Sequence, residues 1–444
     1  MWVTTGDQSK LLTREPDVAF SAADTAGLPT IAVGAPVYQE MVGFGAAITD
    51  ASASLINGLP FERREALLRD LFDADRGGGI GLSFTRITIG ASDFSSRRYS
   101  FDDMPPGQRD PILARFSIEP DRTNRLPVLR RALAINPQLK IVASPWSAPG
   151  WMKTSGGLIG GTLRPDAFGP FAEYLRRYVQ AYAALGVPIY ALTIQNEPHF
   201  EPKDYPGMGL EPPARARFIG EYLGPLLERE RIRTLIFDWD HNWDEPQSPL
   251  RVLADSVARR YIAGVAWHCY GGDVSAQTKV HDAYPAVDTY FTECSGGEWA
   301  PSFADNLVWN VRTLIIGATR NWARGVLLWN LALDEQHGPH LGGCGACRGV
   351  VTIDSRSGAV RRNVEYYALA HASRFVRPGA RRMESSSGVA GLESVAFRNR
   401  DNSRVLIVVN TAPEERRFVV RSAGSTLVYV LPAGAVATLR WLAP

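Results

Sequence analysis

One stretch of the chain joins an apolar run to a carboxylate: Ile189-Tyr190-Ala191-Leu192-Thr193-Ile194-Gln195-Asn196-Glu197-Pro198. Its apolar residues are nearly continuous, which is typical of a parallel strand covered on both faces. Polar residues follow the run, and Pro198 prevents the strand from continuing. The segment therefore predicts a buried parallel strand with functional groups at its C-terminal end.

Similar short runs, rich in Val, Ile, Phe and Thr, recur along the chain. They lie at 42–48, 82–89, 139–144, 234–238, 264–268, 289–293 and 325–329. Amphipathic segments separate them, at 61–72, 126–135, 168–185, 214–229, 249–261 and 307–320. Eight strands that alternate with helices predict an α/β fold, a (β/α)8 TIM barrel, which we place at residues 41–375.

The pattern changes after residue 375. Residues 377–380 read Arg-Pro-Gly-Ala, and strand-like runs follow at 389–397, 404–410, 417–420 and 426–431. No helical period remains, so residues 376–444 predict a small antiparallel β-domain. Residues 1–40 contain short β-like pieces, and we expect them to add a strand to it, because chain termini are often close together. The expected side domain is a β-sandwich built from both termini.

The charge balance limits the possible partners. The 444 residues include 48 basic and 46 acidic side chains, a net charge of +2, whereas nucleic-acid binding requires a clustered basic excess. No apolar run of about 18 residues could span a membrane. We expect no nucleic acid, no membrane span and no obligate protein partner. Residues 1–7 have neither the basic nor the apolar part of a secretion signal.

Four cysteines and seven histidines are the candidate metal ligands. Cys269 and Cys294 lie in apolar stretches, and we interpret them as small core residues. Cys344 and Cys347 form a C-x-x-C without a second such pair or a histidine at zinc-finger spacing, which disfavours zinc. A short-loop disulfide is favoured there over two free thiols. No H-E-x-x-H spacing occurs, so we expect no catalytic metal and no cofactor.

Functional groups of a TIM barrel project from the C-terminal ends of its strands. Polar and aromatic residues occupy these positions: Asp50, Arg86, Asp93, Trp146, Asn196, Glu197, His268, Tyr270, Glu293, Trp329 and Asn330. Two of them are glutamates, Glu197 after the fourth strand and Glu293 at the end of the seventh. Hydrolysis of a glycosidic bond requires two carboxyl groups flanking the anomeric carbon, so this pair predicts a glycoside hydrolase.

Structural explanations compete with this interpretation. Any Glu at a loop start can be a surface residue, although both glutamates follow buried runs. Arg86 could belong to a buried ion pair, His268 could be a satisfied core histidine, and Trp329 could serve only for packing. A carbohydrate-binding protein on an inactive barrel is a further alternative, but such a protein would normally lack one carboxylate.

Five ordered blocks resemble glycoside hydrolase family 30, the family of acid β-glucosylceramidase and the microbial β-1,6-glucanases. They are Val42-Gly43-Phe44-Gly45-Ala46-Ala47-Ile48-Thr49-Asp50, Arg86 with Ser92-Asp93-Phe94-Ser95, Ala143-Ser144-Pro145-Trp146-Ser147-Ala148-Pro149, Asn196-Glu197-Pro198 and Trp329-Asn330-Leu331-Ala332-Leu333. The resemblance implies a barrel with a β-structure from both termini. It also implies a retaining mechanism with Glu197 as acid/base and Glu293 as nucleophile.

The resemblance assigns roles to the neighbouring residues as well. Asp93 and Trp146 would hold the hydroxyls and ring of the terminal sugar, Asn196 would contact its 2-OH, and Trp329 would lie under its ring. The residues that would surround the nucleophile are Arg86, His268 and Tyr270. Arg86 would keep the nucleophile ionised, since a nearby cation lowers a carboxyl pKa.

Two segments resemble the β-1,6-glucanase branch more than the glucosylceramidase branch. The nucleophile block reads Thr292-Glu293-Cys294-Ser295-Gly296-Gly297 rather than Ser-Glu-Ala-Cys, and the loop at 337–349 carries the C-x-x-C. Both favour β-1,6-glucan or gluco-oligosaccharides over a lipid glucoside. Glucosylceramidase, exo-β-glucosidase and β-xylosidase or xylanase activity stay open. Polymeric glucan lies outside the cell, so we expect a secreted or periplasmic enzyme.

Overall fold

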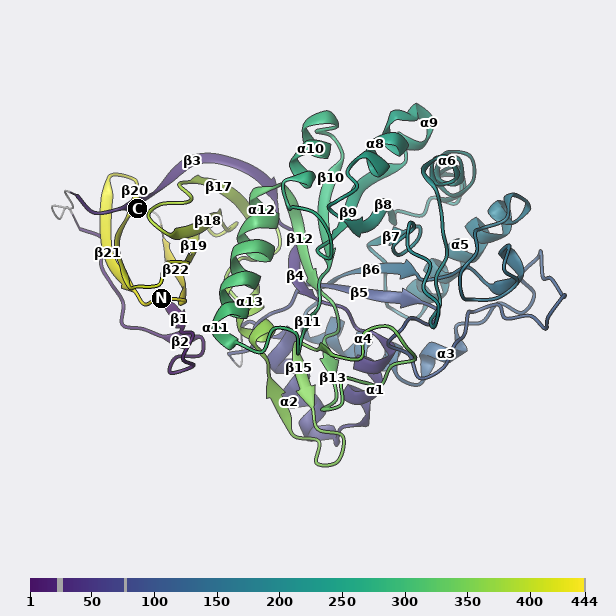
Figure 1. The fold of residues 1–444 in the computed structure, drawn as a ribbon, viewed down its shortest axis with the longest axis horizontal. Coiled ribbons are helices and arrows are strands. Elements are labelled where there is room, and N and C mark those ends of the chain that lie inside the picture. Colours follow the sequence, from purple (N-terminus) through teal and green to yellow (C-terminus); the bar gives the residue numbers. More distant parts are fainter. Residues whose placement is uncertain (22–26, 76–77, 443–444) are drawn as a thin grey trace.

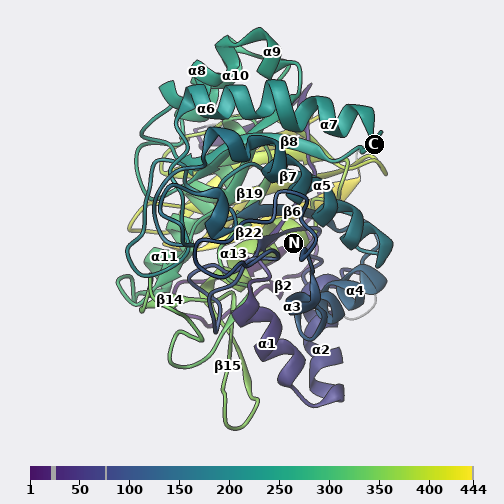
Figure 2. The same cartoon turned by 90° about the vertical axis from the view of Figure 1, so that its right-hand side faces the viewer.

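The structure is a computed structural model that describes residues 1–21, 27–75 and 78–442. It has two units, a barrel surrounded by helices and a β-rich unit that contains both ends of the chain (Figure 1). A quarter turn shows the helices of the barrel unit arranged around its strands (Figure 2).

Eight parallel strands form a closed barrel, as predicted. In chain order they are β4 (Gly43–Ala46), β5 (Phe84–Ile89), β6 (Lys140–Pro145), β7 (Ala191–Thr193), β8 (Leu235–Asn242), β9 (Ile262–His268), β10 (Asp288–Glu293) and β12 (Ala323–Leu328). Each pairs with its neighbours in this order, and β12 pairs with β4 to close the ring. The TIM-barrel prediction is confirmed.

The amphipathic segments predict most of the helices around the barrel, but not those at 50–58, 276–283 and 364–373. The helices include α1 (Asp50–Gly58), α2 (Phe61–Phe72), α4 (Arg125–Ile135), α5 (Phe168–Ala184), α6 (Pro212–Arg217), α7 (Gly224–Arg229), α8 (Gln247–Ala254), α9 (Ser256–Arg259), α10 (Ala276–Ala283), α11 (Phe303–Trp309), α12 (Ala318–Arg320) and α13 (Val364–Ser373). The segment predicted at 249–261 is two helices, because Asp255 is non-helical and caps α9 by accepting from two backbone N–H groups. The segments Phe218–Leu223 and Asn310–Gly317 are π-helical.

In the described part of the chain, the β-rich unit holds nine strands. They are β1 (Trp2–Thr4), β2 (Thr13–Arg14), β3 (Thr30–Glu40), β17 (Arg381–Ser385), β18 (Leu392–Arg398), β19 (Ser403–Asn410), β20 (Arg416–Ser422), β21 (Ser425–Leu431) and β22 (Val436–Leu442). Their order is β2-β1-β22-β19-β18-β17-β3-β20-β21. The N-terminal segment supplies three of them, where one was expected. All pairs are antiparallel except β3 with β20, which corrects the prediction of a purely antiparallel domain. The strands enclose a separate apolar core.

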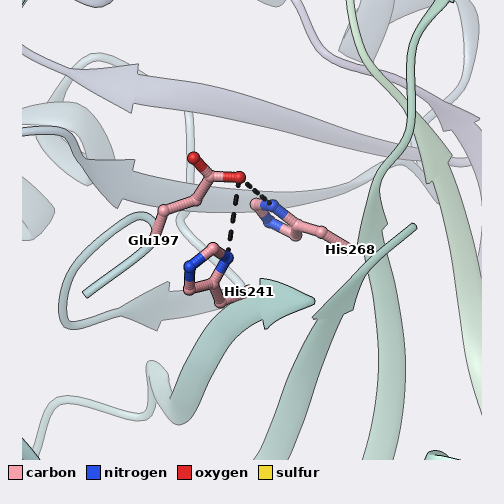
Figure 3. Close-up of side chains that lie close together, drawn as sticks. All are labelled: Glu197, His241 and His268. Carbon is pink, nitrogen blue, oxygen red and sulfur yellow. Dashed lines mark hydrogen bonds and ion pairs between the residues drawn. The ribbon is translucent and has the colours of Figure 1, made fainter. Parts of the chain in front are cut away.

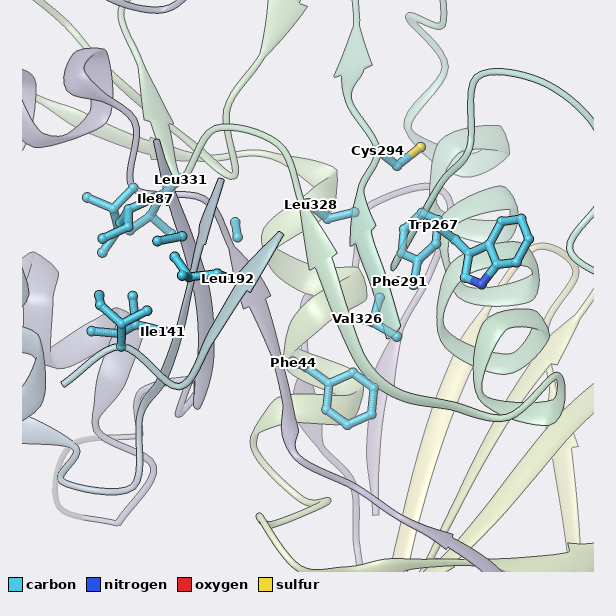
Figure 4. Close-up of a cluster of buried hydrophobic side chains, with 14 of the residues drawn as sticks. Phe44, Ile87, Ile141, Leu192, Trp267, Phe291, Cys294, Val326, Leu328 and Leu331 are labelled. Atoms are coloured by element: carbon cyan, nitrogen blue, oxygen red, sulfur yellow. The ribbon is translucent and has the colours of Figure 1, made fainter. Parts of the chain in front are cut away.

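The barrel strands are buried on both sides, as their continuous apolar runs predict. Residues such as Ile87, Leu192 and Phe291 face outward and pack in the core between barrel and helices (Figure 4). The inward-facing residues form a second cluster with one side chain from each strand or its immediate approach: Val42, Phe84, Val142, Ala191, Phe237, Ala266, Tyr290 and Leu327. We call this cluster the lower layer of the barrel interior.

Candidate active site

The barrel interior becomes polar just above the lower layer. Strand side chains alternate between faces, so residues two positions further along each strand point inward again. On five strands these are polar: Arg86, Ser144, Thr193, His268 and Thr292. Together with Asp240 they form what we call the upper layer, and all are buried.

Asp240, on β8, is the centre of the upper layer. Its Oδ2 accepts hydrogen bonds from Arg86 Nη2 at 2.6 Å, Thr193 Oγ1 at 2.7 Å and Ser144 Oγ at 3.0 Å. Its Oδ1 accepts from Thr292 Oγ1 at 2.7 Å and lies 3.1 Å from His268 Nε2. Burial alone would raise the pKa of Asp240, but Arg86 and His268 lower it well below its usual range. Asp240 is therefore a fixed buried anion.

Asp240 was not predicted from the sequence, because the backbone of β8 is irregular. Strict alternation from Phe237 would point Trp239 inward and Asp240 outward. The register shifts between Trp239 and His241, and both Trp239 (φ 78°) and Asp240 (φ 55°) are left-handed, which turns the carboxylate into the barrel. The run Asp-Trp-Asp-His-Asn at 238–242 was the available signal, because so polar a run directly after a buried strand is unusual.

Glu293 ends β10 beside the upper layer. Arg86 forms an ion pair with its Oε2, and the Tyr270 hydroxyl donates to its Oε1 at 3.0 Å. Burial raises the pKa of the Glu293 carboxyl, and the charges of His268 and Arg86 limit that rise. Arg86 thus lies in a buried ion pair with Asp240 and also contacts Glu293.

Glu197 lies four residues after the end of β7, with a left-handed backbone (φ 46°). Its Oε1 is 3.1 Å from His268 Nδ1 and 3.7 Å from His241 Nδ1 (Figure 3). Burial would raise the pKa of Glu197, but the hydrogen bond and charge of His268 outweigh burial and lower it. Conversely, burial would lower the pKa of His268, but Glu293, Asp240 and Glu197 raise it to about 9. An imidazolium therefore donates one N–H to Asp240 and the other to Glu197.

The two candidate catalytic carboxylates face the same imidazole. His268 Nδ1 lies 3.1 Å from Glu197 Oε1 and 3.9 Å from Glu293 Oε1. The two oxygens are therefore no more than about 7 Å apart, a range that includes the spacing of about 5–5.5 Å found in retaining glycosidases.

The remaining site residues gather around this pair. The rings of Trp146 and Trp329 stack with their centroids 5.1 Å apart, and the Arg86 guanidinium lies 4.7 Å from the Trp146 ring. Asn196 Oδ1 accepts from Arg86 Nη2 at 2.7 Å. Asp93 is buried, its Oδ1 has no hydrogen-bond partner among the described residues, and burial raises its pKa well above the usual value. Asp93 is therefore an available partner for a ligand hydroxyl.

Asp50 belongs to a different network. It forms an ion pair with Arg125 and accepts hydrogen bonds from Tyr99 and Ser95 near the start of α1. These contacts connect the first helix to α4, so Asp50 serves a structural role in the barrel wall.

Three donor atoms in the site could hold a cation. Glu197, His241 and His268 offer one ligand atom each, within 4.8 Å of one another (Figure 3). Burial lowers the pKa of His241 to about 4, so its ring is neutral at pH 7, and its Nδ1 has no hydrogen-bond partner in the described part of the chain. A cation would have to displace the proton of His268.

Both cysteine pairs are disulfides. The predicted Cys344–Cys347 bond is confirmed. Cys269 and Cys294, interpreted as small core residues, do pack at the core, but they are also bonded to each other, which was not predicted. They directly follow His268 and Glu293, which are register partners on the neighbouring parallel strands β9 and β10. The chain separation of 25 residues hid this proximity, and an apolar setting suits a disulfide as well as a thiol.

Comparison with known proteins identifies the class and then the family. A TIM barrel with two carboxylates after its fourth and seventh strands defines a glycoside hydrolase. Residues 41–376 match the glycosyl hydrolase family 30 TIM-barrel domain, and residues 379–439 match the family 30 β-sandwich domain. The chain belongs to glycosyl hydrolase family 30, and the prediction of this enzyme class is confirmed.

Its relatives include several sugar-cleaving enzymes. The chain is 38% identical to an endo-1,6-β-D-glucanase of Aspergillus fumigatus over 84% of this chain and 79% of that protein. It is 29% identical to the lysosomal acid glucosylceramidase of Mus musculus over 91% of this chain and 81% of that protein. A solved endo-β-1,6-glucanase structure superposes with a TM-score of 0.92 at 32% identity, covering 100% of this chain and 99% of that one. Among the described residues, every helix falls short of what a membrane crossing requires.

Proposed function

We propose that the protein hydrolyses β-1,6-linked glucan with retention of the anomeric configuration. One observation carries the proposal: the carboxylates of Glu197 and Glu293 both face the His268 imidazole. Glu293 is in addition ion-paired to Arg86. The choice of glucan is supported by relatives named endo-1,6-β-D-glucanase from three fungi, at 36–38% identity.

In the first chemical step, Glu293 attacks the anomeric carbon while the bond to the leaving oxygen breaks. Its pairing with Arg86 keeps the attacking carboxylate ionised. Glu197 gives a proton to the leaving oxygen. In the free site that proton is held on His268. Bound substrate excludes water from Glu197, and this favours the neutral form of the carboxyl. The proton therefore moves from His268 to Glu197 along their 3.1 Å hydrogen bond. A covalent glycosyl-enzyme results.

In the second step, water attacks the same carbon and the ester bond to Glu293 breaks. Esterification has removed the negative charge of Glu293, so Glu197 is more easily ionised and accepts the proton of the water. Two inversions at one carbon leave the product in the β configuration.

The sugar under attack is held by the residues around the pair. The Asp93 carboxyl, whose Oδ1 has no partner among the described residues, forms a hydrogen bond with the sugar hydroxyls, and Asn196 contacts the 2-OH. Trp329 and Trp146 supply the aromatic surface against which its apolar ring face packs. Tyr270 holds Glu293 in the attacking position.

We also propose that the enzyme acts outside the cytoplasm. Both disulfides persist only in an oxidising compartment, and a polymeric glucan is found outside the cell.

Product analysis on β-1,6-glucan, β-1,3-glucan, xylan and glucosylceramide tests the substrate. We expect soluble gluco-oligosaccharides from β-1,6-glucan and at least tenfold slower turnover of the others. Preference for glucosylceramide or xylan would replace the proposed substrate. Proton NMR of the first product tests the mechanism, because initial release of the α-anomer is incompatible with double displacement.

A further inference from the structure

A short hairpin-like pairing lies beside the catalytic residues. Strand β11 (Gly296–Gly297) begins three residues after Glu293 and pairs antiparallel with β14 (Cys347–Arg348). Gly296 lies opposite Arg348, and Gly297 lies opposite Cys347. The backbone N–H of Glu298 also donates to the carbonyl of Ala346, which extends the contact. The segment after the nucleophile is thereby fixed to the loop that carries the Cys344–Cys347 disulfide.

The two faces of this pairing point to different surroundings. Directly opposed residues of an antiparallel pair project to the same side. Arg348 binds Glu365 of α13 at 2.8 Å, and a Cβ on Gly296 would also meet Glu365, so this face points to α13. The other face carries Gly297 and Cys347. Cys347 packs in one buried cluster with Trp146 and Trp329, so this second face points to the aromatic side of the active site.

The ring of Trp299 lies on that second face. A Cβ on Gly297 would come within 2.0 Å of a Trp299 ring atom, so the indole covers the glycine on the side where Cys347 projects. Gly297 is buried, whereas Trp299 keeps 59% of its surface exposed. The large, flat indole of Trp299 thus packs against the β11–β14 pairing on one side and is exposed to solvent on the other, next to the residues that line the reaction centre.

We propose that Trp299 is a stacking platform for a glucosyl unit adjacent to the unit that is cleaved. The inference rests on the proposed function. Trp146 and Trp329 are almost fully buried in one cluster and serve the sugar at the carboxylates, whereas Trp299 lies outside that cluster and is largely exposed. The axial C–H face of a β-glucosyl ring is flat and apolar, and it buries well against an indole.

A β-1,6-linked chain has particular need of such a platform. Each linkage includes the additional C5–C6 bond, so neighbouring units are more mobile than in a glucan linked directly through ring carbons. Binding must order these units at an entropic cost. A rigid indole offsets that cost by supplying preformed contact area.

Two substrates distinguish glucan binding at Trp299 from the chemical step at the two carboxylates. β-1,6-Glucan places units on both sides of the cleaved bond, whereas β-D-glucosyl fluoride has a single-atom leaving group and cannot reach Trp299. For Trp299→Ala we expect kcat/KM on the glucan to fall about tenfold, mainly through KM, with the fluoride rate within about twofold of wild type. Trp299→Tyr should restore most of the loss.

Trp309→Ala is the matched control, because Trp309 is 42% exposed on α11 in the outer helix layer. It should leave both substrates unaffected. An unchanged glucan KM in Trp299→Ala would overturn the platform, as would an equal loss on the fluoride, which indicates damage to the fold or the reaction centre. If wild type itself cleaves the fluoride but not the glucan, the proposed function fails, and the platform with it.

Discussion

Inside the barrel, the lower and upper layers arise from the same strands, two residues apart, yet their chemistry is opposite. Phe84 is followed by Arg86, Val142 by Ser144, and Ala266 by His268. The first residue of each pair packs in an apolar cluster, and the second belongs to a hydrogen-bonded network centred on Asp240. A step of two residues along a strand therefore leads from a side chain that packs in the apolar cluster to one that belongs to the hydrogen-bonded network.

The difference shows how the barrel can hold buried charges. Buried ions stabilise a fold poorly, because desolvation offsets their mutual attraction, and an ion without its partner destabilises the protein. The lower layer supplies apolar burial that needs no partner, and it fixes the strands whose next inward residues are charged. We therefore expect upper-layer substitutions to change catalysis, with a stability effect that depends on pH, and lower-layer substitutions to change stability alone.

The largest effect is expected for Glu293→Gln. Loss of the attacking carboxylate should lower kcat by about 10⁴-fold or more on both the glucan and β-D-glucosyl fluoride, while the melting temperature stays close to wild type. The matched control is Glu298→Gln, five residues on and exposed at the rim, which should retain activity. Substantial fluoride turnover by Glu293→Gln would remove this residue from the mechanism.

The second effect concerns Asp240→Asn. The amide keeps the shape but loses the charge that orients Arg86 and keeps His268 protonated, so the pKa of His268 should fall. We expect kcat to drop about 10²–10³-fold, with the alkaline limb of the pH–rate profile displaced to lower pH.

Asp238 provides the control for this substitution. It is equally buried on the same strand and paired with Arg215 at 2.9 Å, outside the upper layer. Asp238→Asn should lower stability without moving the pH–rate profile. A profile that is unchanged in Asp240→Asn, or displaced equally in both variants, contradicts the role of Asp240.

The sequence predicted what depends on regular periodicity and on order along the chain. The eight strands, the glutamates after strands four and seven, and their neighbours Arg86, His268 and Tyr270 followed from strand ends and from resemblance. Asp240 did not, because a bulge with left-handed residues reverses the alternation on which such predictions rest. The Cys269–Cys294 disulfide was missed because it connects two strands, and pairing in space has no local sequence signal.

The β-domain was predicted as a class but not in its strand order. Strands β17 and β22 were missed, since β17 (Arg381–Ser385) is short and charged and β22 (Val436–Leu442) follows a turn without clear alternation. The parallel pairing of β3 with β20 joins segments nearly 400 residues apart, which no local pattern specifies.

The third prediction tests the lower layer. Phe84 is fully buried, so Phe84→Ala should lower the free energy of unfolding by about 3 kcal/mol through lost burial and an unfilled cavity. Urea denaturation measures this loss. The folded variant should keep the wild-type pH–rate profile and the KM for glucan, assayed well below its melting temperature. A displaced pH–rate profile would mean that the lower layer also affects catalysis.

The fourth prediction distinguishes the layers by their pH dependence. The pKa of folded His268 is raised from 6.5 to about 9, so its stabilising contribution is fully present below about pH 6.5 and is lost as the pH rises through about 9. Asp240, Glu197 and Glu293 supply the raising charges. We expect the unfolding free energy of wild type to exceed that of His268→Gln by about 3 kcal/mol more at pH 6 than at pH 9.5. Phe84→Ala removes no titrating group, so its loss of unfolding free energy should stay constant over the same pH range. If the His268→Gln difference is also constant, the folded imidazole is neutral, and the proton that Glu197 gives to the leaving oxygen does not come from His268.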